Sequence, residues 1–212
     1  MRPVLYSFRR CPYAMRARLA LAASGIEVEL REIVLRDKPA AFLATSPSAT
    51  VPCLLTNEGV IDESLDIMTW ALEQNDPSHW LEMPQQGWQW IKEADGPFKR
   101  ALDRCKYVSR YPESDPQEER ARAKAFLSRL DAQIDHWIFA APRLADYALL
   151  PFVRQFAFID KAWFDAQPWP KLQAWLEHFL NSDEFARIMQ KHPQWEEGTP
   201  GIVFPPKTAF GT

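Results

Sequence analysis

Apolar positions near the N-terminus fall into two short runs with a longer apolar segment between them. Residues 3–6 form the first run, and residues 12–24 are apolar or small apart from a tyrosine, a serine and two arginines. In residues 26–31 apolar side chains alternate with charged ones, which is the two-residue period of a half-buried strand. Gly25 suits the end of a helix, because glycine tolerates the left-handed conformation found there. The pattern predicts a right-handed βαβ unit with two parallel strands.

A second group of elements follows the βαβ unit. Residues 37–43 are expected to form a short helix, which the Ser-Pro-Ser sequence at 46–48 ends. Residues 51–55 are apolar, and a turn containing glycine leads into residues 60–61, which is typical of a β-hairpin. Apolar residues then recur at the spacing of one helix face: Leu65, Ile67, Met68, Ala71 and Leu72. The first domain, residues 1–75, is therefore expected to be βαβ followed by ββα.

The pattern changes after the first domain, where an Asp-Pro pair and Pro84 indicate an irregular connection. A helix is expected to begin at Asp115, which can cap it and is followed by a proline and a glutamine-glutamate pair. Three helical faces are predicted by the following residues: Ala123, Phe126, Leu127, Leu130, Ile134 and Trp137; the run from Tyr147 to Phe158; and Leu172, Trp175, Leu176, Phe179 and Leu180. The second domain, residues 84–212, is expected to be all helical, with an irregular tail after Pro200.

Composition and charge narrow the class of protein. Hydrophobic residues make up 47% of the chain and there are nine tryptophans, so a packed globular protein is expected rather than a disordered one. The net charge of −3 gives no electrostatic case for binding nucleic acid or an anionic membrane. Neither a signal peptide nor an apolar run of about 18 residues is seen, so the expected compartment is the cytoplasm. Three cysteines argue against a disulfide framework.

Cys11 is the residue whose setting points most directly to chemistry. Pro12 suits the first position of the predicted helix, so Cys11 lies at or just before its start. The free N–H groups and the helix dipole favour a thiolate there, and such settings lower a cysteine pKa from about 8.5 to roughly 3.5–7.5. Of the nearby arginines, Arg9 and Arg10 are the best placed to act in the same direction. Cys11 is thus a candidate nucleophile, the alternative being a small buried apolar residue.

The other chemistry-bearing residues suggest no second site. Cys53 and Cys105 stand in apolar runs, which is typical of core residues. The four histidines are not spaced as metal ligands, so no metal site is expected. Arg16 and Arg18 are more typical of a solvated helix face. Ala14 occupies the place where a Cys-x-x-Cys motif has its second cysteine, so Cys11 has no resolving partner nearby in the sequence.

Three motifs together resemble the glutathione transferases: Cys11-Pro12-Tyr13, Val51-Pro52 and Glu63-Ser64. Taken alone, Val51-Pro52 is only a strand start and Glu63-Ser64 only a helix start, so their order and spacing after the cysteine carry the resemblance. It covers nearly the whole chain and implies a thioredoxin-like α/β domain followed by an all-helical domain. The Cys-Pro-Tyr sequence resembles the omega class and related two-domain glutaredoxins, where other classes have tyrosine or serine.

The resemblance also implies roles for individual residues. The bond before Pro52 is expected to be cis and to present the Val51 backbone to the cysteinyl part of glutathione. Ser64 is expected to bind the γ-glutamyl carboxylate at a helix N-terminus, and Glu63 the ammonium group. Lys38 matches a lysine that faces the glycyl carboxylate in the omega class. With Cys11 as the catalytic residue, the expected glutathione-binding residues are Pro12, Tyr13, Lys38, Val51, Pro52, Glu63 and Ser64.

Two positions depart from the family pattern. Arg143 stands where the helical domain usually has serine or threonine, so Asp146 is expected to satisfy that helix start alone. The loop at residues 48–50 lacks a glycine that is often found before Val51, and it is expected to hold the peptide differently.

The expected function is that of a glutathione-dependent thiol transferase or reductase acting through a Cys11–glutathione disulfide. Its expected partners are glutathione, as cosubstrate, and a small electrophilic or disulfide substrate, with no metal, nucleic acid or membrane. A homodimer is implied by the resemblance only. Two alternatives stay open: a transferase that conjugates glutathione, and an interaction module that has the fold without turnover.

Overall fold

The N-terminal apolar run forms β1 (Val4–Ser7), the middle strand of a five-stranded sheet. The structure, a computed structural model, describes residues 2–206. The strand order is β4-β3-β1-β2-β5, with β2 parallel to β1 and all other neighbours antiparallel. The remaining strands are β2 (Val28–Glu32), β3 (Cys53–Leu55), β4 (Val60–Ile61) and β5 (Ile202–Phe204). The predicted βαβ unit and β-hairpin are therefore confirmed.

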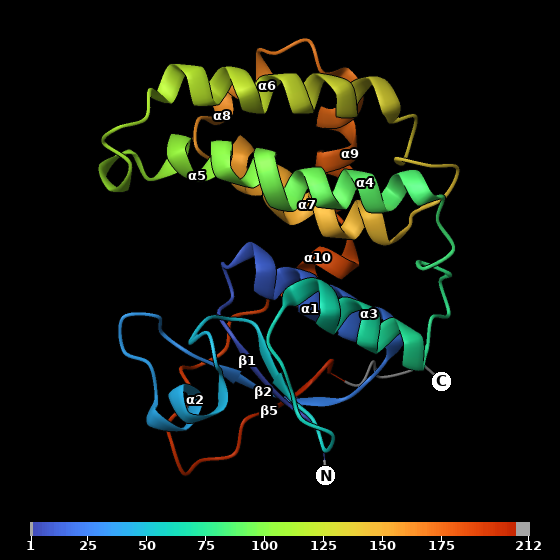
Figure 1. The fold of residues 1–212 in the computed structure, drawn as a ribbon. Coiled ribbons are helices and arrows are strands. Elements are labelled where there is room, and N and C mark those ends of the chain that lie inside the picture. The colour runs from blue at the N-terminus through green and yellow to red at the C-terminus, as the bar shows by residue number, and fades with distance from the viewer. Residues whose placement is uncertain (1, 207–212) are drawn as a thin grey trace. The chain divides into compact units, whose positions relative to one another are not determined.

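Four helices cover the two faces of this sheet. They are α1 (Pro12–Ser24), α2 (Ala40–Thr45), α3 (Ser64–Gln74) and α10 (Asp183–Ile188). α1, α3 and α10 lie together on one face, and α2 lies on the other (Figure 1). On the α2 face, the ring centroid of Tyr6 lies 5.2 Å from that of Phe42 and 5.9 Å from that of Trp195. Cys11 packs against the buried cluster that contains these rings, so the thioredoxin-like core reaches the candidate nucleophile.

β5 corrects the expectation that the tail after Pro200 is irregular. It pairs antiparallel with β2, with Ile202 opposite Leu30. Phe204 is buried, and a Cβ at Gly201 would come within 2.7 Å of the Leu30 carbonyl oxygen, so only glycine fits this close approach. Three residues between a glycine and a proline are too few to predict a strand without knowing its partner.

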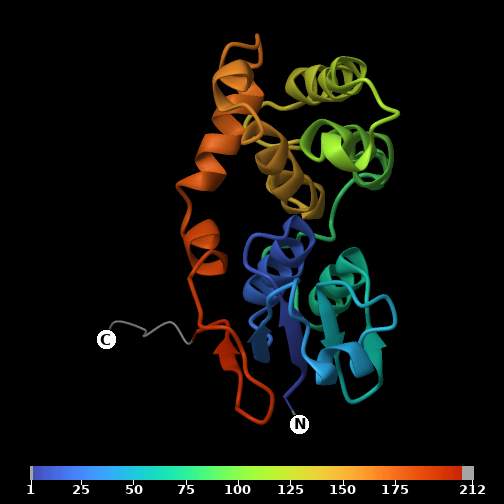
Figure 2. The same cartoon turned by 90° about the vertical axis from the view of Figure 1, so that its left-hand side faces the viewer.

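The elements between α3 and α10 are all helical, as expected. The elements are α4 (Gln85–Glu93), a π-helical turn η1 (Ala94–Phe98), α5 (Lys99–Lys106), a 3₁₀ turn η2 (Val108–Arg110), α6 (Pro116–Gln133), α7 (Leu144–Ala157), α8 (Lys161–Asp165) and α9 (Pro170–Leu180). α7 is in contact with α4, α5 and α9 (Figure 1, Figure 2). Pro97 lies in the π-helical turn, where a missing N–H is consistent with the wider hydrogen-bond pattern. α6 ends before Ile134, so Trp137 lies beyond the helix that the pattern predicted.

A buried carboxylate closes the start of α7. Asp146 is 0% exposed, and its Oδ2 accepts a hydrogen bond of 2.9 Å from the N–H of Arg143. Its Oδ1 accepts from the N–H of Ile138 and from Nε1 of Trp175, each at 3.0 Å. The Arg143 guanidinium has no acceptor atom to return such a bond, so the carboxylate carries the side-chain half of the cap, as the sequence predicts.

Contacts divide the chain into two compact units: Met1–His79 with Asp183–Thr212, and Trp80–Ser182. The expected second domain, residues 84–212, differs from this division. The chain after Ser182 joins the first unit because α10 packs on α1 and β5 pairs with β2. The last part of that expected domain, 207–212, lies outside the described residues. Among the described residues, no helix combines the length and the apolar character needed to span a bilayer.

Candidate functional site

Cys11 directly precedes α1 and is the cap of that helix. Its backbone is extended, with φ −73° and ψ 124°, and Pro12 takes the first helical position. The N–H of Met15 donates to the Cys11 carbonyl at 2.9 Å, and the N–H of Cys11 donates to the Phe8 carbonyl at 3.0 Å. The side chain is half-buried. The sulfur is thus held at a helix N-terminus, where the dipole favours negative charge.

The Val51 backbone lies next to this sulfur. Sγ of Cys11 is 3.7 Å from the carbonyl oxygen of Val51. The peptide bond between Val51 and Pro52 is cis, as the resemblance implies, and both residues are buried. Tyr13 is half-buried in the first turn of α1, with the Arg16 guanidinium 5.9 Å from its ring centroid. Five of the eight expected site residues therefore lie at one end of the sheet: Cys11, Pro12, Tyr13, Val51 and Pro52.

Lys38 holds the loop that precedes the cis peptide. Its Nζ donates to the carbonyl of Ala49 at 3.0 Å. Ala49 has φ 53°, in the left-handed region that glycine enters at least cost. Its N–H donates to the Ser46 carbonyl at 3.2 Å. Ala49 thus adopts the left-handed conformation that a glycine would take in this loop, and the hydrogen bond from Lys38 holds it there.

Asp62 connects the same loop to the start of α3. Its Oδ1 accepts from Ser46 Oγ and its Oδ2 from the N–H of Ser48, each at 2.9 Å. Burial acts against the charge, but the donors of Ser48 and Ser46 hold the pKa of Asp62 below its ordinary value. Glu63 follows as the exposed cap of α3, and Ser64 is its buried first residue. The sequence did not single out Asp62, because its role depends on a loop that is distant along the chain.

Arg18 corrects the interpretation of the arginines. It was expected on a solvated face, yet it is 2% exposed and its guanidinium donates to Ser7 Oγ at 2.5 Å and to the Arg9 carbonyl at 2.6 Å. Most of α1 is buried, so an arginine on it has to reach polar partners inside the unit. The signal in the sequence was that Arg16 and Arg18 are the only charged residues of an otherwise largely apolar segment.

The other two cysteines have the character of core residues. Burial, aided by the charge of Asp62, raises the pKa of Cys53 to about 12. Burial also raises the pKa of the half-buried Cys105. Both thiols are therefore protonated at neutral pH and are poor nucleophiles. Within residues 2–206, histidine, cysteine and carboxylate side chains form no group of three that could hold a metal ion.

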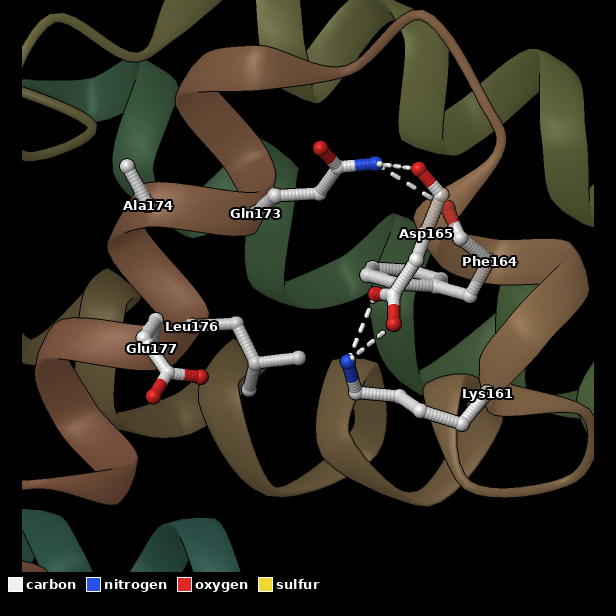
Figure 3. A pocket seen from close by; sticks show the side chains of 7 residues that line it. All are labelled: Lys161, Phe164, Asp165, Gln173, Ala174, Leu176 and Glu177. Carbon is white, nitrogen blue, oxygen red and sulfur yellow. Dashed lines mark hydrogen bonds and ion pairs between the residues drawn. The ribbon is translucent and has the colours of Figure 1, made fainter.

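The hollow in Figure 3 belongs to the helical unit and has a volume of about 290 Å³. Three of its four polar side chains form bonds within the lining. Nζ of Lys161 lies 2.6 Å from Oδ1 of Asp165, and Nε2 of Gln173 donates to the carbonyls of Phe164 and Asp165 at 3.0 and 3.2 Å. The Gln173 bonds join the end of α8 to α9, while the Lys161–Asp165 pair lies within α8, as the dashed lines show (Figure 3). The hollow therefore lies where α8 connects to α9, and its Gln173 side chain has a structural role in that connection.

Comparison with protein families finds two matches that together span most of the chain. The model described as "Glutathione S-transferase, N-terminal domain" matches residues 5–80, and the one described as "Glutathione S-transferase, C-terminal domain" matches residues 89–178. The first contains the Cys11 helix start, the cis peptide and the start of α3.

Curated relatives agree with these matches. A probable glutathione transferase of Aplysia californica is 47% identical over 57 residues, which are 27% of this chain and 62% of that protein. Glutathione S-transferase omega-1 of Sus scrofa is 42% identical over 55 residues, 26% of this chain and 23% of that protein. Glutathione S-transferase L3 of Arabidopsis thaliana is 28% identical over 86% of this chain and 80% of that protein. The first and the omega-1 match thus each span less than two thirds of the relative.

Solved structures share the fold. Glutathione transferase Omega 3C from Trametes versicolor superposes with a TM-score of 0.76 at 19% identity, over 92% of this chain and 91% of that one. A glutathione transferase from Pseudomonas putida, solved with glutathione disulfide bound, has a TM-score of 0.76 at 19% identity, over 89% and 91% of the two chains. The chain therefore belongs to the glutathione S-transferase family and is similar to its omega class.

Proposed function

We propose that the protein is a glutathione-dependent thiol transferase whose nucleophile is the Cys11 thiolate. The thiolate attacks the glutathione sulfur of a mixed disulfide, which forms a Cys11–glutathione disulfide and releases the substrate thiolate, protonated by water. A glutathione thiolate then attacks the bound glutathione sulfur, so that Cys11 leaves as a thiolate and glutathione disulfide is formed. The mixed disulfide is thereby reduced to the substrate thiol, and one free glutathione is oxidised as it joins the glutathionyl group taken from the substrate.

The observation that carries this proposal is the half-buried Cys11 thiol at the start of α1, 3.7 Å from the Val51 carbonyl oxygen. The start of α1 favours the thiolate form, and the Val51 backbone beside the sulfur can bind the peptide of glutathione. Ala14, in place of a second cysteine, leaves the Cys11–glutathione disulfide to be resolved by a second glutathione. Conjugation is disfavoured, since a cysteine forms a disulfide with glutathione instead of only donating a hydrogen bond to it.

In this proposal glutathione lies along the edge that Val51, Lys38 and the start of α3 form. The Val51 backbone binds the cysteinyl unit beside Pro12, Tyr13 and Pro52. Glu63 binds the γ-glutamyl ammonium group. Ser64 and the α3 N-terminus bind its carboxylate, and Lys38 binds the glycyl carboxylate. Lys38 supports this placement, because its ammonium group has three N–H donors and one of them binds the Ala49 carbonyl. The Pseudomonas putida relative of the same fold, which holds glutathione disulfide, also supports it.

Glu63→Gln and Ser64→Ala are each expected to weaken glutathione binding by about 1–3 kcal/mol, because a charged hydrogen bond is left unmade. Isothermal titration of glutathione into each variant measures the effect. Glu58→Gln is the matched control, since Glu58 is exposed on the turn between β3 and β4 and its change removes the same charge. Unchanged affinity in both site variants would contradict this placement of glutathione.

A mass measurement tests the proposed intermediate. Wild-type protein mixed with a glutathionylated peptide is expected to release the peptide thiol and to gain the mass of one glutathione at Cys11, located by peptide mapping. Cys11→Ala retains Cys53 and Cys105 and is expected to show neither change. A wild type that takes up no glutathione and does not turn over would exclude the transferase and favour the interaction module.

The compartment and the assembly belong to the same proposal. Exchange with glutathione needs a reducing compartment, and none of the three cysteines is in a disulfide within the described residues, so we place the protein in the cytoplasm. The homodimer implied by the resemblance stays a prediction.

A further inference from the structure

A buried arginine fastens the loop that leads to Cys11. Arg18 lies seven residues, about two helical turns, after Cys11, so both fall on the same side of α1. Side chains on a helix point back toward its N-terminus, and that of Arg18 does so. Its Nη1 donates to Ser7 Oγ at 2.5 Å and its Nη2 to the Arg9 carbonyl at 2.6 Å. The loop from Ser7 to Cys11 is therefore held from the helix that it starts.

Glu32, at the end of β2, holds the same loop from the other side. Its Oε1 accepts a hydrogen bond of 2.7 Å from the N–H of Arg9. The next residue, Ile33, donates its N–H to the Ser7 carbonyl at 2.8 Å. Arg9 is thus bound through both its N–H and its carbonyl, by groups that carry opposite charges.

The charges in this cluster act on one another. Burial lowers the pKa of Arg18 to about 10, the negative charges of Glu32 and Cys11 raise it, and Arg9 lowers it. Burial raises the pKa of Glu32, against the Arg9 N–H and the charges of Arg18 and Arg9. Burial lowers the pKa of His192, with Arg18 and Arg9 acting in the same direction. Electrostatic coupling is reciprocal, so a positive Arg18 favours a negative Cys11.

We propose that Arg18 and Glu32 are positioning residues for Cys11: Arg18 fixes the loop that leads to Cys11 and places a buried positive charge beside that loop, while Glu32 holds Arg9 and offsets that charge. The inference rests on the proposed function, because it concerns the nucleophile of that reaction. It assigns opposite electrostatic effects to two groups that both hold the loop.

The opposite signs provide the test. Cys11 alkylation by iodoacetamide is followed by peptide mass mapping between about pH 4 and 10, which separates Cys11 from the other thiols. Arg18→Gln is expected to raise the midpoint by about one pH unit or more, the effect of losing a nearby opposite charge. Glu32→Gln keeps an oxygen for the Arg9 N–H and is expected to lower the midpoint. A role in structure alone would not move the two midpoints in opposite directions.

Two further variants are controls. Arg18→Lys keeps the charge and is expected to restore most of the midpoint shift, although it cannot make both loop bonds in the same geometry. Arg16→Gln removes an equal charge from another buried arginine of α1 and is expected to move the midpoint less than half as far. Thermal unfolding checks that each variant is folded. If Arg18→Gln does not fold, Glu32→Gln and Arg18→Lys decide.

Failure of this inference is distinguishable from failure of the proposed function. A wild-type midpoint near about 8.5, that of a free thiol, would overturn the proposed function. A low wild-type midpoint that Arg18→Gln and Glu32→Gln leave unchanged, or move in the same direction, would overturn the positioning roles alone.

Discussion

Cys11→Ser is expected to lower the rate of thiol exchange at least about a thousandfold, the scale on which removal of a nucleophile lowers turnover in other enzymes. A serine hydroxyl at the α1 N-terminus remains protonated at neutral pH, so it cannot form the disulfide with glutathione. Glutathione binding is expected to persist, since the Val51 backbone and the start of α3 are unchanged. Exchange with a small glutathione mixed disulfide and calorimetric binding measure the two effects separately.

The control for Cys11→Ser is Cys105→Ser. Both thiols are half-buried, but Cys105 lies in α5 and its pKa is raised by burial, so its loss should leave exchange unchanged. Retention of more than a tenth of wild-type exchange by Cys11→Ser would contradict the proposed mechanism. Conjugating activity gained by the same variant would support the alternative chemistry, in which a hydroxyl hydrogen-bonds the glutathione thiolate.

Asp146→Asn is expected to lower the free energy of unfolding by about 2–4 kcal/mol, the cost of leaving a buried polar group without its partner. The carboxylate accepts from three N–H donors, two on Oδ1 and one on Oδ2. An asparagine presents its NH₂ group to one of these sides, so at least one donor faces another donor. Asp135→Asn, at an exposed position close in sequence, is the control. Urea unfolding that gives both variants the same stability would exclude this role.

The pH dependence of the same pair of proteins is a second test of Asp146. Burial raises the pKa of Asp146 to about 6, although the N–H donors of Ile138, Arg143 and Trp175 lower it. Because the pKa in the folded chain is above its unfolded value, loss of the proton opposes folding, and this cost is fully present above about pH 6 and absent below about pH 4. Asparagine does not titrate. The advantage of wild type over Asp146→Asn is therefore expected to grow as the pH falls from 7 to 5.

The fold was predictable wherever one segment carries its own pattern. The alternating residues of β2 and the Asp115–Pro116 start of α6 are local signals, and both elements form where they indicate. β5 was missed because its three residues become a strand only through pairing with β2. That residues after Ser182 belong to the first compact unit depends in the same way on contacts with that unit, which no local pattern indicates.

The candidate site divides in a similar way. Cys11, Pro12 and the Val51–Pro52 pair were recognisable because helix starts and X-Pro pairs are local features of the sequence. Arg18 was misinterpreted because the sequence pattern of two arginines on a helix does not show whether their side chains face solvent or a buried loop. Nothing in the sequence around Glu32 indicates that its carboxylate accepts a hydrogen bond from the Arg9 N–H. Such pairings depend on tertiary packing, which no spacing along the chain encodes.

The pairing of β5 with β2 has a consequence for synthesis on the ribosome. Glu29 lies opposite Val203, so the edge of β2 has no partner until Val203 is made roughly 9–35 s later, at about 5–20 residues per second. Throughout that time the aromatic face of Tyr6 and Phe42 lacks Trp195. The helical unit, which is continuous in sequence, emerges whole before then. The unit that contains Cys11 is therefore begun first and completed last, and a nascent chain stalled before β5 would expose an open strand edge to other chains.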